Sequence, residues 1–176
     1  GDIIAVGNQT FEEDNVDTIE KKGMAEAVIY KLSGKDGSVI FQKAMGGKQS
    51  DIFNCVVKTT KGFAVGGKTS STDRDFEGYS GNSAVLIHFD TDFNILWSKG
   101  LGGTKGGSID GISADTLGNI FVSCITNSTD GDFASFNGLM GGYVDTVIIK
   151  YNYQGSRQWY RVIASSGRDE FRAIQA

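Results

Sequence analysis

The sequence predicts an all-β protein, a β-propeller built of three four-stranded repeats. Residues of similar type recur at intervals of 56 to 62 residues, which indicates an internal repeat. The three columns are Phe41, Trp97 and Trp159; Val28, Val85 and Val147; and Thr10, Thr69 and Thr126. The 25 glycines, the absence of proline and the short runs of Val, Ile and Phe are typical of short strands joined by tight turns.

Length and charge limit the organisation and the partners. A chain of 176 residues is long enough for one core, so we expect a single domain, 1–176, with repeats at about 1–61, 62–118 and 119–176. The net charge is −4 with both signs interspersed, so nucleic acid is not an expected partner. The longest apolar runs have only the length of a strand, so no membrane span is expected.

Each repeat is expected to hold four strands. The turn at Lys35, Asp36 and Gly37 is a hairpin signal, because Asp-Gly tolerates the positive φ that such turns need. The expected strands are 3–10, 27–32, 38–45 and 52–59; 63–70, 84–89, 94–101 and 109–115; and 119–126, 146–151, 156–163 and 170–176. Four antiparallel strands without a helix fit a propeller blade, which covers the apolar face of its neighbour. The alternative is a β-trefoil, although trefoil repeats are usually shorter.

The stretch WSKGLGG…GISADTLGNIFVSCITNS, which begins at Trp97, resembles the SBBP repeats of bacterial β-propeller proteins. The other two copies depart from the pattern: Phe41 replaces the Trp in the first, and Ala164 to Gly167 replace the double glycine in the third. The resemblance implies a secreted or cell-envelope protein and an architecture, not an activity. It also implies that the Trp strand is outermost and that the strand after the glycine pair is innermost.

By this analogy the chain begins at the second strand of one blade and ends with the first strand of another. Residues 170–176 could then pair with residues 3–10, but a ring of three blades would be implausibly tight. We expect either that two chains exchange these ends to form a homodimer with a six-bladed ring, or that the chain is a fragment of a larger propeller with open edges.

The long loops 11–23, 71–82 and 127–143 are expected on the same face as the glycine-rich links, and this face is the candidate functional surface. Two of them share the similar cores STDRDF and STDGDF. The candidate ligand-binding residues are Asp73, Asp75, Phe76, Tyr79, Asp130, Asp132, Phe133 and Phe136. The aromatic rings could stack on sugars, or they could pack a long loop onto its blade.

Calcium is the one cofactor that the loops suggest. Carboxylates two residues apart can point to one cation, which makes Asp73, Asp75, Asp130 and Asp132 the candidate ligands. The first loop offers Glu12, Glu13, Asp14 and Asp17 at the same level. The competing interpretation is that Asp and Gly at this spacing form ordinary turns.

Three further features have structural interpretations. The segment Asp90 to Asn94 resembles the start of a calcium loop, but its position in the repeat predicts a hairpin turn. The single histidine, His88, is expected on a strand face rather than in a catalytic group. Cys55 and Cys124 each lie in an apolar run, which favours buried free thiols over a disulfide.

These observations predict a non-catalytic binding or structural module of an extracellular or cell-envelope bacterial protein, with a carbohydrate or a protein as its ligand. The alternative is a carbohydrate-active enzyme, because glycoside hydrolysis needs only two carboxyl groups at a suitable separation. The loop acids could supply such a pair.

Overall fold

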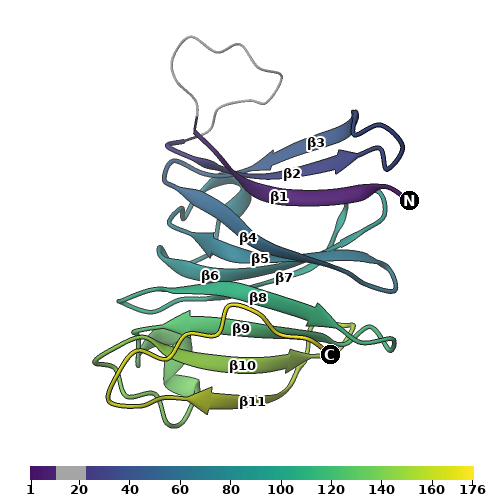
Figure 1. Cartoon of the computed structure of the whole chain (residues 1–176). Coiled ribbons are helices and arrows are strands. Elements are labelled where there is room, and N and C mark those ends of the chain that lie inside the picture. Colours follow the sequence, from purple (N-terminus) through teal and green to yellow (C-terminus); the bar gives the residue numbers. More distant parts are fainter. Residues whose placement is uncertain (11–22) are drawn as a thin grey trace.

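The computed structural model describes residues 1–10 and 23–176, which form eleven strands, two short 3-10 helices and no α-helix (Figure 1). The predicted all-β class is confirmed. The strands are β1 (Ile3–Gln9), β2 (Glu26–Leu32) and β3 (Val39–Met45); β4 (Asp51–Lys58), β5 (Gly62–Thr69), β6 (Ser83–Asp90) and β7 (Ile95–Leu101); and β8 (Gly107–Ala114), β9 (Ile120–Thr126), β10 (Asp145–Tyr151) and β11 (Arg157–Ile163). The 3-10 helices are η1 (Arg74–Phe76) and η2 (Gly131–Ser135).

The strands form three antiparallel sheets that lie one above another in Figure 1. The first sheet has the order β1-β2-β3, the second β4-β5-β6-β7 and the third β8-β9-β10-β11. The sheets are therefore offset by one strand from the sequence repeats, because the last strand of each repeat opens the next sheet. The stack is open, which does not agree with the β-trefoil alternative, since a trefoil closes its strands into a barrel.

One of the predicted strands needs correction. All four strands expected in the first repeat are present, and the first sheet has three strands because the fourth, β4, opens the second sheet. Residues 170–176, expected to be a strand, are not one, since the chain after β11 crosses the face of the third sheet (Figure 1). A strand is defined by a ladder of hydrogen bonds with a neighbouring backbone, and no strand in residues 1–10 and 23–163 pairs with this segment.

The strand registers confirm the spacing of the two sequence columns that begin at Phe41 and Val28. They shift the third column by one residue. Gln9, rather than Thr10, stands in the first sheet where Thr69 stands in the second.

Two apolar clusters hold the stack together, one between each pair of neighbouring sheets. The central strand β6 contributes to both, since Val85 and Ile87 pack on the first sheet whereas Ala84 and Leu86 pack on the third. This alternation follows from the two-residue period of a strand. Burying one such aliphatic side chain contributes about 1.5–3 kcal/mol, so strands with two apolar faces specify a stacked sheet.

The three structural interpretations are confirmed. The segment from Asp90 to Asn94 is the β6–β7 turn, in which an Asp90 carboxylate oxygen accepts the Asn94 N–H at 2.9 Å. His88 lies buried on β6. Cys55 and Cys124 are free thiols, of which Cys124 is buried and Cys55 partly buried, and desolvation raises the pKa of each to about 12.

Across the described ranges, no helix is both long and apolar enough to cross a membrane.

Candidate functional site

The loops after β5 and β9 emerge at the same end of the sheets as the links that lead into β4 and β8, as expected. This end lies on the left in Figure 1. Each loop and the link beside it belong to one sheet, because β4 and β5 are neighbours and so are β8 and β9. The acidic residues Glu12, Glu13, Asp14 and Asp17 of the first loop lie outside the described residues.

In the second sheet, three side chains of the loop 71–75 each accept one backbone N–H from the link 46–49. The pairs are Asp75 with Gly46 at 2.9 Å, Asp73 with Lys48 at 3.0 Å and Ser71 with Gln49 at 3.1 Å. We call this arrangement the link clamp. It satisfies amides that the link would otherwise leave without a protein partner.

The third sheet repeats the link clamp with the loop 128–132 and the link 102–105. The pairs are Asp132 with Gly102 at 2.8 Å, Asp130 with Thr104 at 3.0 Å and Ser128 with Lys105 at 2.9 Å. The Thr104 N–H is the main reason that the pKa of Asp130 lies below its ordinary value. The shared STD-x-D-F core is therefore the sequence of a structural device.

The double glycines allow the clamp to close. A Cβ atom on Gly47 would lie 2.3 Å from an Asp73 carboxylate oxygen, and one on Gly103 would lie 2.6 Å from the Ser128 Cβ. Only a residue without a side chain fits at these two positions.

Each of the four candidate carboxylates thus accepts a hydrogen bond from a backbone amide. Within residues 1–10 and 23–176, no group of three or more His, Cys, Asp or Glu side chains is arranged to hold a metal ion. The calcium ligands suggested by the sequence, Asp73, Asp75, Asp130 and Asp132, do not form such a group.

The loop aromatics pack inward. Phe76 and Phe133 have no exposed surface and Phe136 is 3% exposed, so a ligand-stacking role does not fit these rings. Phe76 contacts the half-buried Tyr79 edge to face at 5.6 Å, and Phe136 contacts Tyr160 in the same way at 5.0 Å. The second contact joins its loop to β11, and Phe76 also belongs to the apolar cluster between the first and second sheets. The rings therefore pack the two loops onto the sheets, which is the alternative that the sequence left open.

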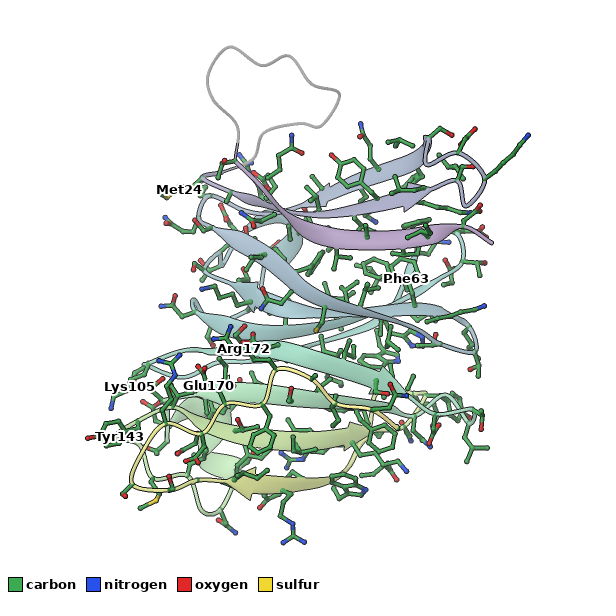
Figure 2. All side chains as sticks on the ribbon, viewed as in Figure 1. Met24, Phe63, Lys105, Tyr143, Glu170 and Arg172 are labelled. Atoms are coloured by element: carbon green, nitrogen blue, oxygen red, sulfur yellow. The ribbon has the colours of Figure 1, made fainter. Side chains whose placement is uncertain are left out.

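Beside the clamps, at the loop end of the second and third sheets, lies a polar pocket of about 240 Å³. Its walls come from the ends of β5 and β9, the link before β8 and the segment after β11. Among the lining residues are Lys68, Asn82, Lys105, Asn127, Arg168 and Glu170. Figure 2 shows Lys105, Tyr143 and Glu170 on the same side of the molecule, at the loop end.

Three cationic side chains line this pocket, and one of them is paired. Arg168 contacts Glu170, which also binds Arg172 at 3.1 Å. Lys105 donates from Nζ to the Gly141 carbonyl at 3.0 Å, which joins the link to the long loop after β9. Next to the lining residue Val144, the Tyr143 ring is 58% exposed.

No sequence motif includes these pocket residues. Their only sequence signal was a position near expected strand ends on the loop face. Lysine and arginine donors with neighbouring amides suit a ligand that carries carboxylate and hydroxyl oxygens. The chain matches no protein-family model and no curated protein.

Proposed function

We propose that this chain is part of a β-propeller in which each sheet is one blade, and that it serves as a non-catalytic binding module of a secreted or cell-envelope protein. The ligand is an acidic carbohydrate held in the pocket at the loop end. The resemblance to SBBP repeats supports the architecture and the location, and the chemistry of the pocket supports the ligand.

The blade interpretation is supported by the order of strands. In both four-stranded sheets the chain enters at one edge strand, β4 or β8, and proceeds through adjacent strands to the opposite edge, β7 or β11. The Trp97 and Trp159 strands are then the outer ones, as the resemblance implies. Each sheet also packs on the next through apolar side chains, which is how blades are held in a propeller.

The main support for an acidic ligand is that Lys68, Lys105 and Arg168, which belong to three separate segments, line one pocket. Cations that meet in a concave site attract carboxylates. The Asn82 and Asn127 amides suit sugar hydroxyls, and the exposed Tyr143 ring beside the pocket offers a stacking surface. The link clamp of the third sheet fixes the backbone of Lys105, so part of the site is preorganised.

Calorimetric titration with an oligogalacturonate, a neutral oligosaccharide of equal length and an acidic peptide tests this proposal. We expect saturable binding of the oligogalacturonate alone, weakened at least tenfold in Lys68→Ala with Arg168→Ala. Lys99→Ala, an exposed lysine on β7, is the matched control and should bind normally. Equal binding of the neutral sugar, preference for the peptide, or unchanged affinity in the double variant would contradict the proposed ligand.

A further inference from the structure

At both ends of the stack, some apolar side chains of the described residues face away from the neighbouring sheet. On β10, Val147, Ile149 and Tyr151 pack toward the second sheet, so the alternate residues face away from it. Phe121 and Trp159 lie on that outer face, where Trp159 is 44% exposed. The first sheet packs on the second, and the second packs on the third, through the equivalent face.

On the first sheet, the face in question is the one that points away from the second sheet. On this side Ile3 is 52% exposed, whereas its counterparts by strand register, Phe63 and Ile120, are 4% and 0% exposed. Leu32 similarly matches the buried aromatic rings of Phe89 and Tyr151. The first sheet therefore carries apolar side chains at positions that the other two sheets bury against a preceding sheet. A sheet face like the outward face of the third sheet would pack on these side chains.

The segment after β11 approaches the third sheet as β4 approaches the first and β8 the second. In each case a backbone N–H at the start of the incoming segment donates to the carbonyl just before a central strand. The pairs are Asp51 with Ala25 at 2.9 Å, Gly107 with Asn82 at 3.1 Å and Asp169 with Val144 at 2.7 Å. Residues 169–176 thus begin where the first strand of a further sheet would begin.

Asp169 also repeats the role of Asp51. The Asp51 carboxylate accepts the Gly47 N–H, and the Asp169 carboxylate accepts the N–H of Ser165, the matching link residue. The Asp51 carboxylate also accepts hydrogen bonds from the Thr69 hydroxyl at the end of β5 and from the Ser71 hydroxyl in the loop that follows. From the described residues, Asp169 accepts only the Ser165 amide.

Among the described strands, β1 pairs only with β2, so its other edge corresponds to the edge of β5 that pairs with β4 in the second sheet. A Cβ atom on Gly67 of β5 would fall 2.0 Å from the Ile52 carbonyl oxygen of β4. At Gly7, the counterpart on β1, an added Cβ atom would meet nothing within 4 Å. An unpaired strand edge of this kind is a template for another strand.

We propose that residues 169–176 of one copy pair antiparallel with β1 of a second copy, whose first sheet is covered by the third sheet of the first copy. The reciprocal exchange joins two copies of residues 1–176 into six four-stranded sheets. In the register of β4 and β5, Asp169 stands opposite Gln9, Glu170 opposite Asn8 and Phe171 opposite Gly7. This inference rests on the sheet geometry and does not depend on the ligand.

The side chains agree with this register. Gln9 accepts a hydrogen bond from the Tyr30 hydroxyl through its Oε1 atom at 3.2 Å, and the NH₂ group of the same side chain is a donor that suits the Asp169 carboxylate. Phe171, 43% exposed in the single chain, takes the place of Phe53, which is 1% exposed. The exchange therefore buries the Phe171 ring at the position equivalent to that of the buried Phe53 ring in the second sheet.

The first test is the absolute mass of the chain by light scattering and sedimentation equilibrium over a dilution series. We expect a dimer at twice 18.8 kDa, and a monomer when the chain is truncated after Arg168. Tyr153 is an aromatic residue about as exposed as Phe171 but lies outside residues 169–176, so the control variant Tyr153→Ser should remain dimeric. A monomer at every concentration, a dimer that survives truncation, or a series of larger species would overturn the reciprocal exchange.

The second test reports the register. Asn8→Cys with Glu170→Cys should oxidise to an intermolecular disulfide, because the two positions lie opposite each other across the exchanged strand. Ile4→Cys with Glu170→Cys places the thiols four residues out of register and should not. The pKa of about 12 at Cys55 and Cys124 keeps the native thiols unreactive. Equal cross-linking of both pairs would overturn the proposed register. Lys68→Ala should change neither mass nor cross-linking.

Discussion

Asp75 and Asp132 hold equivalent positions in neighbouring sheets, and each accepts the backbone N–H of the first glycine in the link to its own sheet, Gly46 at 2.9 Å and Gly102 at 2.8 Å. A carboxylate in a repeated loop motif often indicates a ligand site. In this protein the repetition arises because the second and third sheets use the same clamp.

Removal of the clamp carboxylate should cost stability. In Asp132→Ala the Gly102 N–H, which belongs to a buried residue, loses its acceptor, and we expect unfolding to become easier by about 1–3 kcal/mol. Urea denaturation of the variant and of Asp92→Ala, an exposed turn carboxylate, measures the difference. Equal stability of the two variants would mean that water replaces the carboxylate without loss.

The loop aromatics should behave as core residues. Phe133→Ala removes a side chain with no exposed surface, so we expect a loss of about 3–5 kcal/mol in the free energy of unfolding. Leu117→Ala, at a residue 78% exposed, should stay within about 0.5 kcal/mol of the parent. Denaturant midpoints give both values. A Phe133→Ala protein as stable as Leu117→Ala would show that the ring is not an anchor.

His88 should make stability fall in mild acid. Its Nε2 atom lies 2.8 Å from the Thr59 hydroxyl, and burial, followed by the charge of Lys61, lowers its pKa from 6.5. The unfolded chain then binds the proton more readily, so this contribution is complete above pH 6.5 and decreases as the pH falls toward the lower folded value.

Thermal melts from pH 7.5 to pH 5 test this sign. His88→Gln keeps a polar side chain that does not titrate, so its melting temperature should change less over this range than that of the parent. The same pH dependence in both proteins would assign the effect to other groups.

Asp130 should contribute to stability at a lower pH. Its pKa is lowered from 3.8, chiefly by the Thr104 N–H, so the folded state favours the ionised carboxylate. The associated stability is present above pH 3.8 and is lost as the pH falls through the folded value. Asp130→Asn should therefore show a shallower decline of the melting temperature below pH 4. An equally steep decline would contradict this assignment.

The strand pattern was predictable because its causes are local. Alternating apolar residues and turn residues such as Asp36-Gly37 act within a few positions of each other, and the structure has strands on both sides of that turn. The position of Gln9 in the repeat was misjudged by one residue, because Thr10 resembles Thr69 more closely than Gln9 does. Backbone register, rather than residue type, decides that alignment.

The candidate site was harder to predict. The sequence identified the STD-x-D-F loops and the correct end of the sheets, but it could not show that Asp75 and Asp132 accept amides from links about thirty residues away. The pocket cations Lys68, Lys105 and Arg168 belong to no motif, since they meet only when separate segments fold together.

The sequence by itself determined that this protein consists of short antiparallel strands in a repeat of just under sixty residues, because alternation and turn chemistry act locally. Only the tertiary structure decided the uses of the carboxylates, the aromatic rings and residues 170–176. A carboxylate binds whichever donor the fold brings to it, and an aromatic ring is buried or exposed according to its packing. A strand forms only where a second backbone pairs with it through hydrogen bonds, and among the described residues no strand pairs with residues 170–176.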